Sequence, residues 1–407
     1  MERKQLEAKA EEYLTHLCRR IPNRRVGAEG NRMATEWFAE KMRAAGFAVE
    51  MPWFNCIDWQ DEGAHLLALN GEVFEVFSSP YTLGCSVLAP LVVVRTVDQL
   101  AASHLTGMIL MLSGEIAAEQ VMPKNFPFYN PEHHQQIVRL LEEKAPLAII
   151  TATGRNPELA GGLYPFPMIE DGDFDIPSVY MKDVDGEKLA QLPRQQIALT
   201  IDSTRIQAKG CNVIARKPAG DSQRVVLCAH IDAKDNTPGA LDNGTGVVTL
   251  ALLAELLADY SGPLGVELLA FNGEDHYSAQ GQKEYLKSRL TEFSQIALAI
   301  NTDVAGYVQG NSAFSLYGVS DQISSLVREV MGQFASFQEG EQWYQSDHSV
   351  FIQNGCPAVA ITSDQFMRLS TEVTHTPADD LDLVDYGLLV DVALALEQVV
   401  RRLNAVI

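Results

Sequence analysis

Residues that could bind metal ions are spread over the C-terminal half of this chain of 407 residues. Zinc binds neutral imidazole nitrogen and carboxylate oxygen. A carboxylate has two oxygens and can bridge two ions, as a two-metal centre requires. The candidates, in chain order, are His230, Asp232, Asp242, Glu274, Asp275, Asp303 and His375. Their types predict a site for two divalent cations.

Three predicted strands end just before several of these residues, which explains how they could meet. The predicted strand 225–229 ends before His230, the strand 265–271 ends before Glu274 and Asp275, and the strand 296–300 ends before Asp303. From residue 208 onward such strands alternate with predicted helices, which favours a mostly parallel sheet. Because ligands of these sheets collect beyond the carboxyl ends of the strands, we expect one shared rim.

The length of the chain favours two domains over a single core. We expect a catalytic domain of residues 1–81 and 208–407, of α/β class, with a three-layer, mixed but mostly parallel sheet and helices on both faces. Short antiparallel strands are expected over 47–80. Residues 82–207 have short strands broken by proline-rich segments and one clear helix, HHQQIVRLLEEKAP. They predict a small, inserted, β-rich domain.

The overall charge argues against several classes of partner. The net charge is -22, and no basic stripe is present, so we expect no nucleic-acid binding. The longest apolar runs are far below the roughly 20 residues that a bilayer requires, so we expect no membrane insertion. The charged N-terminus lacks a signal-peptide pattern, which predicts a cytoplasmic protein. A homo-oligomer is compatible with the sequence.

Two of the acidic residues fit roles other than ligation. Glu274 lies beside a ligand and is free to act as general base on a metal-bound water. Asp232 lies two residues from His230, on the same side of an extended segment, and could hold the imidazole N–H. Each segment alone also fits a structural role, such as a helix cap at Asp242 or a solvated turn at Glu274. The occurrence of all of them in one chain favours the chemical interpretation.

The combination resembles the co-catalytic zinc exopeptidases, which include bacterial zinc aminopeptidases and glutamate carboxypeptidases. The shared segments are HID, PGALDNGTG, NGED, NTD, SDHSVF and THTPADD, in this order. The resemblance covers residues 208–407 and extends to the helix pair expected at 2–46. Softer cues in the middle segment, such as HLTGMILML and DIPSVYM, resemble the protease-associated domain that interrupts many of these peptidases.

The resemblance implies a role for each residue of the cluster. His230 and Asp303 would bind one zinc, Asp275 and His375 the other, and Asp242 would bridge them. Glu274 would be the base and Asp232 would support His230. The resemblance also implies a cis peptide bond after Asp242.

One departure concerns the metals. Many relatives have glutamate where this chain has Asp275, which is one methylene shorter. The second site could therefore be weaker or select another ion, so Co²⁺ or Mn²⁺ stay open beside Zn²⁺.

A metal-dependent aminopeptidase that removes N-terminal residues from peptides is the favoured hypothesis. Substrate-pocket candidates are Trp343, Tyr344, His348 and Phe366, near or within SDHSVF and SDQFMRL. A carboxypeptidase or amidohydrolase with the same metals would need a cationic clamp, for which Arg368 is the nearest residue. A scaffold that has lost catalysis would have lost ligands, and this chain keeps all five.

Overall fold

The computed structural model describes residues 2–21, 23–127, 129–155, 162–192, 196–218 and 223–407. The chain divides into two compact units. The first comprises Met1–Cys56, Lys209–Leu369 and Val373–Ile407, and the second comprises Ile57–Ala208 and Ser370–Glu372. The first boundary thus lies at Cys56 and not at residue 81. The region 47–80 contains the expected short antiparallel strands, β1 (Ala48–Glu50), β3 (Val73–Phe74) and β4 (Phe77–Ser78). It also contains one long strand that was not expected, β2 (Trp53–Ala68), most of which belongs to the second unit.

The first unit contains an eight-stranded mixed sheet. Its strands in spatial order are β1 (Ala48–Glu50), β10 (Val213–Lys217), β12 (Gly265–Phe271), β11 (Arg224–His230), β13 (Ile296–Thr302), β16 (Ala358–Ser363), β14 (Ser312–Tyr317) and β15 (Phe337–Glu339). Neighbours among β12, β11, β13 and β16 are parallel, as are β14 and β15. The other three pairs are antiparallel. The predicted α/β class with a mixed sheet is confirmed.

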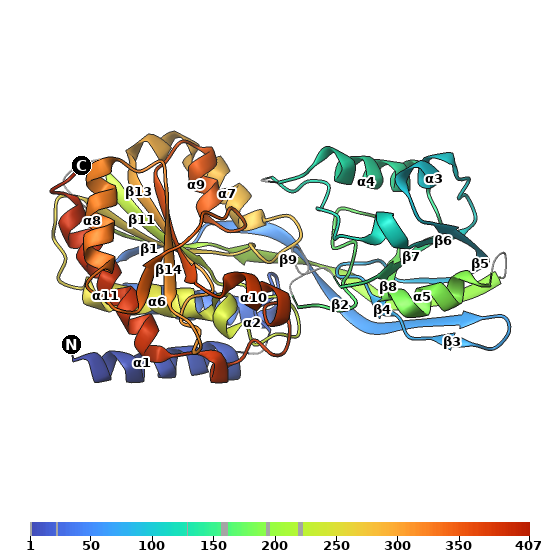
Figure 1. Cartoon of the computed structure of the whole chain (residues 1–407), viewed down its shortest axis with the longest axis horizontal. Helices are drawn as coiled ribbons and strands as arrows, with labels where there is room; N and C mark the ends of the chain where they lie inside the picture. The colour runs from blue at the N-terminus through green and yellow to red at the C-terminus, as the bar shows by residue number, and fades with distance from the viewer. Residues whose placement is uncertain (1, 22, 128, 156–161, 193–195, 219–222) are drawn as a thin grey trace. The chain divides into compact units, whose positions relative to one another are not determined.

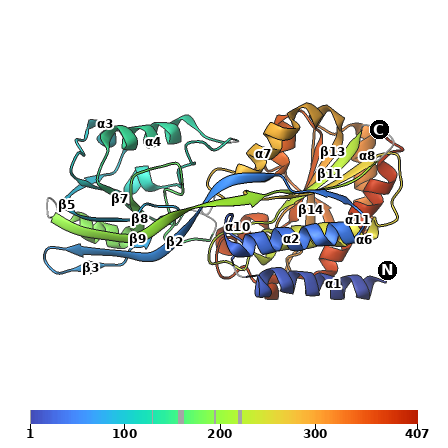
Figure 2. The same cartoon turned by 180° about the vertical axis from the view of Figure 1, so that it is seen from behind.

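Helices cover both faces of this sheet (Figures 1 and 2). The helices of this unit are α1 (Arg3–Thr15), α2 (Glu29–Ala44), α6 (Thr245–Leu256), α7 (Gln280–Arg289), α8 (Asp321–Met331), α9 (His348–Gln353), α11 (Tyr386–Leu403) and most of α10 (Phe366–Glu372). Val225 and Leu227 of β11 belong to one apolar core with α1, α2, α6, α8 and α11. Phe271 of β12 instead packs against Tyr285 of α7 and Phe351 of α9. Strands buried on both faces explain the continuous apolar runs in the sequence.

The second unit has its own sheet, with three helices among its described residues. The strands in spatial order are β3 (Val73–Phe74), β2, β9 (Gln196–Cys211), β5 (Cys85–Val94), β6 (Ile109–Leu112), β7 (Ala148–Thr153), β8 (Ser178–Lys182) and β4 (Phe77–Ser78). The helices are α3 (Val97–Ala102), α4 (Glu132–Lys144) and α5 (Asp183–Ala190). Only α4 was expected, because α3 and α5 span about two turns and are too short to show a helical period. Among the described residues of this unit, more lie in strands than in helices, and two helices are present beyond the one expected.

Helices long and apolar enough to cross a bilayer do not occur in the part of the chain that the structure describes.

Candidate metal centre

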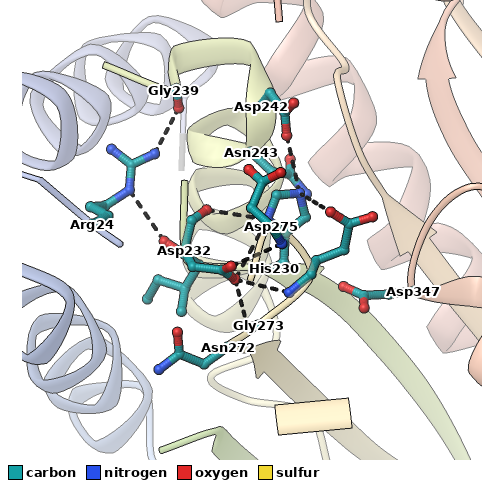
Figure 3. Close-up of polar contacts among 12 residues, drawn as sticks. Arg24, His230, Asp232, Gly239, Asp242, Asn243, Asn272, Gly273, Asp275 and Asp347 are labelled. Atoms are coloured by element: carbon teal, nitrogen blue, oxygen red, sulfur yellow. Dashed lines mark hydrogen bonds and ion pairs between the residues drawn. The ribbon is translucent and has the colours of Figure 1, made fainter. Parts of the chain in front are cut away.

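The ends of three neighbouring parallel strands bring candidate ligands to one rim of the first unit's sheet. His230 is the last residue of β11, Asp303 directly follows β13, and Asp275 lies in the loop after β12. Asp242 lies in the irregular segment before α6, and His375 lies just after α10. Figure 3 shows His230, Asp242 and Asp275 converging on one point.

The five residues form two groups that share Asp242. His230 Nε2 lies 3.2 Å from Asp242 Oδ1 and 3.5 Å from Asp303 Oδ1. His375 Nε2 lies 3.3 Å from Asp242 Oδ2 and 3.1 Å from Asp275 Oδ1. Ligand atoms around a tetrahedral zinc ion are about 3.3 Å apart, given bonds of about 2.0–2.1 Å. Both groups have this spacing, and each uses a different oxygen of Asp242.

Several atoms of these groups are buried but form no hydrogen bond within the described residues. They are His230 Nε2, Asp275 Oδ2 and Asp303 Oδ1. A buried polar atom without a partner costs about 1–3 kcal/mol, and more if it is charged. Cations at the centre of each group would bind these atoms, so the donor set fits two divalent ions.

The density of carboxylates strongly shifts the pKa of both histidines. Burial lowers the pKa of His230, but Asp303, Asp232 and Asp242 outweigh this effect and raise it well above its ordinary value. For His375, burial is outweighed mainly by Asp275 and Asp242, which raise the pKa to about 10. Without metal ions, the surrounding carboxylates therefore favour the protonated form of both imidazoles, as expected for a site with an excess of negative charge.

Glu274 lies next to the ligands without being held by them. Its Oε2 is 4.0 Å from His230 Nε2, and 25% of its side chain stays exposed. Burial, together with Asp275 and Asp303, raises the pKa of Glu274 well above its ordinary value. A carboxylate with a raised pKa is a better proton acceptor than a free glutamate.

Asp232 supports the site differently from the sequence-based expectation. Its carboxylate oxygen Oδ1 is 3.7 Å from His230 Nδ1, which is too long for a hydrogen bond. The carbonyl oxygen of Asp232 instead lies 3.2 Å from this nitrogen. The carboxylate accepts the backbone N–H groups of Gly273 at 2.8 Å and Asp275 at 3.0 Å. Asp232 thus fixes both the histidine and the loop that carries Glu274.

A buried arginine that the sequence did not single out holds the backbone of two ligand segments. Arg24 donates to the carbonyl oxygens of Ile231 at 3.2 Å, Pro238 at 2.8 Å and Gly239 at 2.7 Å. Figure 3 shows Arg24 beside Gly239. Its sequence context, NRRVG, contains no motif that distinguishes it from Arg25.

Asp379 and Ser346 support two of the candidate ligands from outside, and a further hydrogen bond holds Asp347. Asp379 accepts the backbone N–H groups of Leu241 at 2.7 Å and Asp242 at 3.0 Å. Ser346 donates to Asp303 Oδ2 at 2.7 Å, and Gln282 donates to Asp347 Oδ1 at 2.7 Å. The motifs THTPADD and SDHSVF contained Asp379, Ser346 and Asp347, but the contacts of these residues depend on the folded loops.

The peptide bond between Asp242 and Asn243 is cis, as the resemblance implied.

The expected substrate-pocket residues separate into two kinds. His348 is fully buried, and its ring nitrogens face the Trp343 carbonyl oxygen and the Asn301 amide, so it supports its loop and does not face substrate. Trp343 packs against Phe366 with ring centroids 4.7 Å apart and the ring planes tilted by 34°. Tyr344 keeps 56% of its surface exposed.

A second group with metal-ligand residues lies in the other unit and does not fit a metal ion. Glu119 Oε1 is 2.9 Å from His133 Nε2 and 3.1 Å from His134 Nε2. However, the Met122 backbone N–H donates to His134 Nδ1 at 3.2 Å. A neutral imidazole that accepts at Nδ1 has its proton on Nε2, which cannot then bind a metal. This group is explained by histidine–glutamate pairing.

Comparison with known proteins agrees with this geometry. Residues 212–400 match peptidase family M28, a family of co-catalytic zinc exopeptidases. This part of the chain is similar to that family. A probable lipoprotein aminopeptidase, LpqL, from Mycobacterium tuberculosis is 26% identical over 287 residues, which are 69% of this chain and 54% of that protein. The chain spans about half the length of the curated relatives it matches.

Two solved structures share the fold over almost the whole chain. The aminopeptidase from Aneurinibacillus sp. strain AM-1 aligns with a TM-score of 0.76 at 19% identity, over 97% of this chain and 93% of that one. A zinc aminopeptidase from Bacillus subtilis, BSAP, aligns with a TM-score of 0.74 at 19% identity, over 98% and 94%. The similarity at this identity shows the fold.

Proposed function

We propose that this protein is a metal-dependent aminopeptidase that removes N-terminal residues from peptides. The observation that carries the proposal is the shared carboxylate of Asp242, whose two oxygens each face one histidine at 3.2–3.3 Å. The family match and the aminopeptidases among the relatives support the reaction class. Zn²⁺ is the proposed metal, at two sites.

The ligands divide between the two ions in a simple way. His230 and Asp303 would hold one ion, Asp275 and His375 the other, and Asp242 both. Asp275 Oδ1 lies 3.1 Å from His375 Nε2, so the shorter side chain supports ligation. When bound, the ions would lower the pKa of water and stabilise negative charge on the scissile carbonyl.

Glu274 would move the proton. Its carboxylate takes a proton from the attacking water and delivers it to the nitrogen of the leaving amine. Asp232 accepts the Glu274 N–H at 3.3 Å, which fixes the backbone from which this side chain reaches the rim. The raised pKa of Glu274 favours taking up the proton in the first of these steps.

The variant Glu274→Gln tests this proposal. It should keep its bound metal and lose peptide hydrolysis, because the amide cannot accept the proton, whereas the exposed control Glu341→Gln should behave as wild type. A fully active Glu274→Gln enzyme contradicts the mechanism. Bound zinc below one equivalent in reconstituted wild-type protein would favour a non-catalytic scaffold instead.

Peptides with a free or an acetylated α-amine separate an aminopeptidase from a carboxypeptidase or amidohydrolase. We expect cleavage of the free-amine peptide only. The nature of the second unit as a protease-associated domain, the cytoplasmic location and the oligomeric state stay predictions.

A further inference from the structure

A positively charged cavity of about 430 Å³ lies in the first unit, apart from the ligand cluster. Its wall combines the side of α7 with β2 and β9. The residues that matter for its chemistry are Trp53, Lys209, Gln280, Lys283, Glu284 and Lys287. Three lysines against one glutamate is unusual in a chain whose net charge is -22.

The lysines of this cavity are arranged so that an anion would stabilise them. The side chains of Lys209 and Lys287 form no ion pair or hydrogen bond with any residue that the structure describes. Lys283 and Lys287 are four residues apart on α7 and therefore lie on one face of the helix. A bound carboxylate would supply a counter-charge for the ammonium groups of Lys209 and Lys287.

An exposed aromatic ring adds an apolar surface to the cavity. Trp53 exposes 53% of its surface. Covering this large ring with a ligand would remove apolar surface from water and so favour binding. Lysine binds carboxylate as a flexible point charge and does not demand one fixed geometry. The combination suits an anionic group carried on a peptide chain better than a free inorganic ion.

The cavity wall touches the loop that carries the proposed base. Gln280 is the first residue of α7, and its backbone nitrogen would be 3.2 Å from a Cβ placed on Gly273. Gly273 lies two positions before the candidate ligand Asp275, and its backbone N–H donates to the carboxylate of Asp232. Helix α7, which carries Lys283 and Lys287, thus begins beside the loop of the proposed base.

We propose that this cavity binds aspartate or glutamate side chains of acidic peptides, downstream of the residue that is cleaved. The preference during cleavage rests on the proposed aminopeptidase function. The binding of an acidic peptide to the cavity does not depend on that function.

Binding is measured by titration calorimetry and tryptophan fluorescence. The probes are a hexapeptide with Leu-Ala followed by four glutamates and its counterpart with four glutamines. We expect tighter binding of the acidic peptide, weakened by salt. The double variant Lys283→Gln/Lys287→Gln should lower its affinity by roughly fivefold, the size expected for two partly exposed ion pairs. The matched control Lys4→Gln, exposed on α1, should leave it unchanged.

Kinetics on the full-length, metal-loaded protein complete the test. The ratio of kcat/KM between the two peptides should fall towards one in the double variant, while hydrolysis of leucine p-nitroanilide stays constant. Equal affinity of wild type for both peptides, or a double variant that binds like wild type, overturns the proposal. If the acidic peptide binds selectively but neither is cleaved, the aminopeptidase proposal fails and the cavity stands.

Discussion

The carboxylate of Asp379 offers the sharpest test of how the bridging ligand is positioned. It is fully buried and accepts two consecutive backbone N–H groups, at 2.7 and 3.0 Å, one of them from Asp242 itself. Burial and the nearby charge of Asp242 raise the pKa of Asp379 to about 7. At about pH 8 the side chain is therefore mostly ionised and can accept both bonds.

The substitution Asp379→Asn keeps the size of the side chain but replaces one acceptor oxygen by an NH₂ group. That group faces a backbone N–H, so one charge-assisted hydrogen bond is lost and a buried donor is left unpaired. Such a loss costs about 2–3 kcal/mol. If this energy is lost from the positioning of Asp242 for zinc binding, zinc affinity drops by roughly 30- to 100-fold, since about 1.4 kcal/mol corresponds to a factor of ten. Loss of an outer partner of a metal ligand typically costs 10- to 100-fold.

The test of Asp379→Asn measures zinc affinity at about pH 8 by competition with a chromophoric chelator. The control Asp382→Asn, which removes an exposed carboxylate from the same loop, should bind zinc as wild type does. The unfolding free energy of metal-free Asp379→Asn should fall by less than the loss in binding, because relief of repulsion with Asp242 offsets part of the cost. An Asp379→Asn protein that binds zinc within twofold of wild type refutes the reasoning.

Three further predictions follow from other contacts of the centre. Burial lowers the pKa of His348 in the folded protein from 6.5 to about 4. As the pH falls, the unfolded chain therefore takes up a proton at this histidine before the folded protein does. Stability should thus fall by up to about 3 kcal/mol between pH 6.5 and 4, and denaturant titrations should show a shallower fall in His348→Gln. Arg24→Met should lower the unfolding free energy by about 3 kcal/mol and weaken zinc binding, since four carbonyls lose their donor, whereas the exposed Arg20→Met should do neither. Ser346→Ala should weaken zinc binding by roughly tenfold through Asp303, as read by the same chelator competition, and an unchanged affinity would contradict that contact.

The sequence predicted the part of the fold that follows from strand pattern. Apolar runs that end at His230, before Asp275 and before Asp303 placed these residues at one rim, and the sheet order β12, β11, β13 agrees. Pattern could not predict the first boundary, because the 16 residues of β2 belong to both units and show no break. Nor could it predict α3 and α5, which are too short to show a period.

The supporting contacts of the site were beyond the sequence for a different reason. Asp232 acts through its carbonyl on His230 and through its carboxylate on the loop after β12, and a spacing of two residues does not distinguish these contacts. His348 stands in a family motif, yet its ring is turned to the backbone of Trp343. Side-chain direction inside irregular loops depends on tertiary packing, which a single sequence does not reveal.

The N-terminal segment matters to the metal centre although it supplies no ligand. Arg24 joins the backbone at Ile231, between His230 and Asp232, to the backbone at Gly239, just before Asp242. These two segments carry His230, a proposed ligand of one ion, and Asp242, the proposed bridge between two ions. Arg24 therefore helps to fix their relative position together with Asp379, because its planar array of donors can bind several carbonyl oxygens at once. A lysine at this position could not hold the same carbonyls, and the spacing of 3.2 Å between His230 and Asp242 would lose one of its constraints.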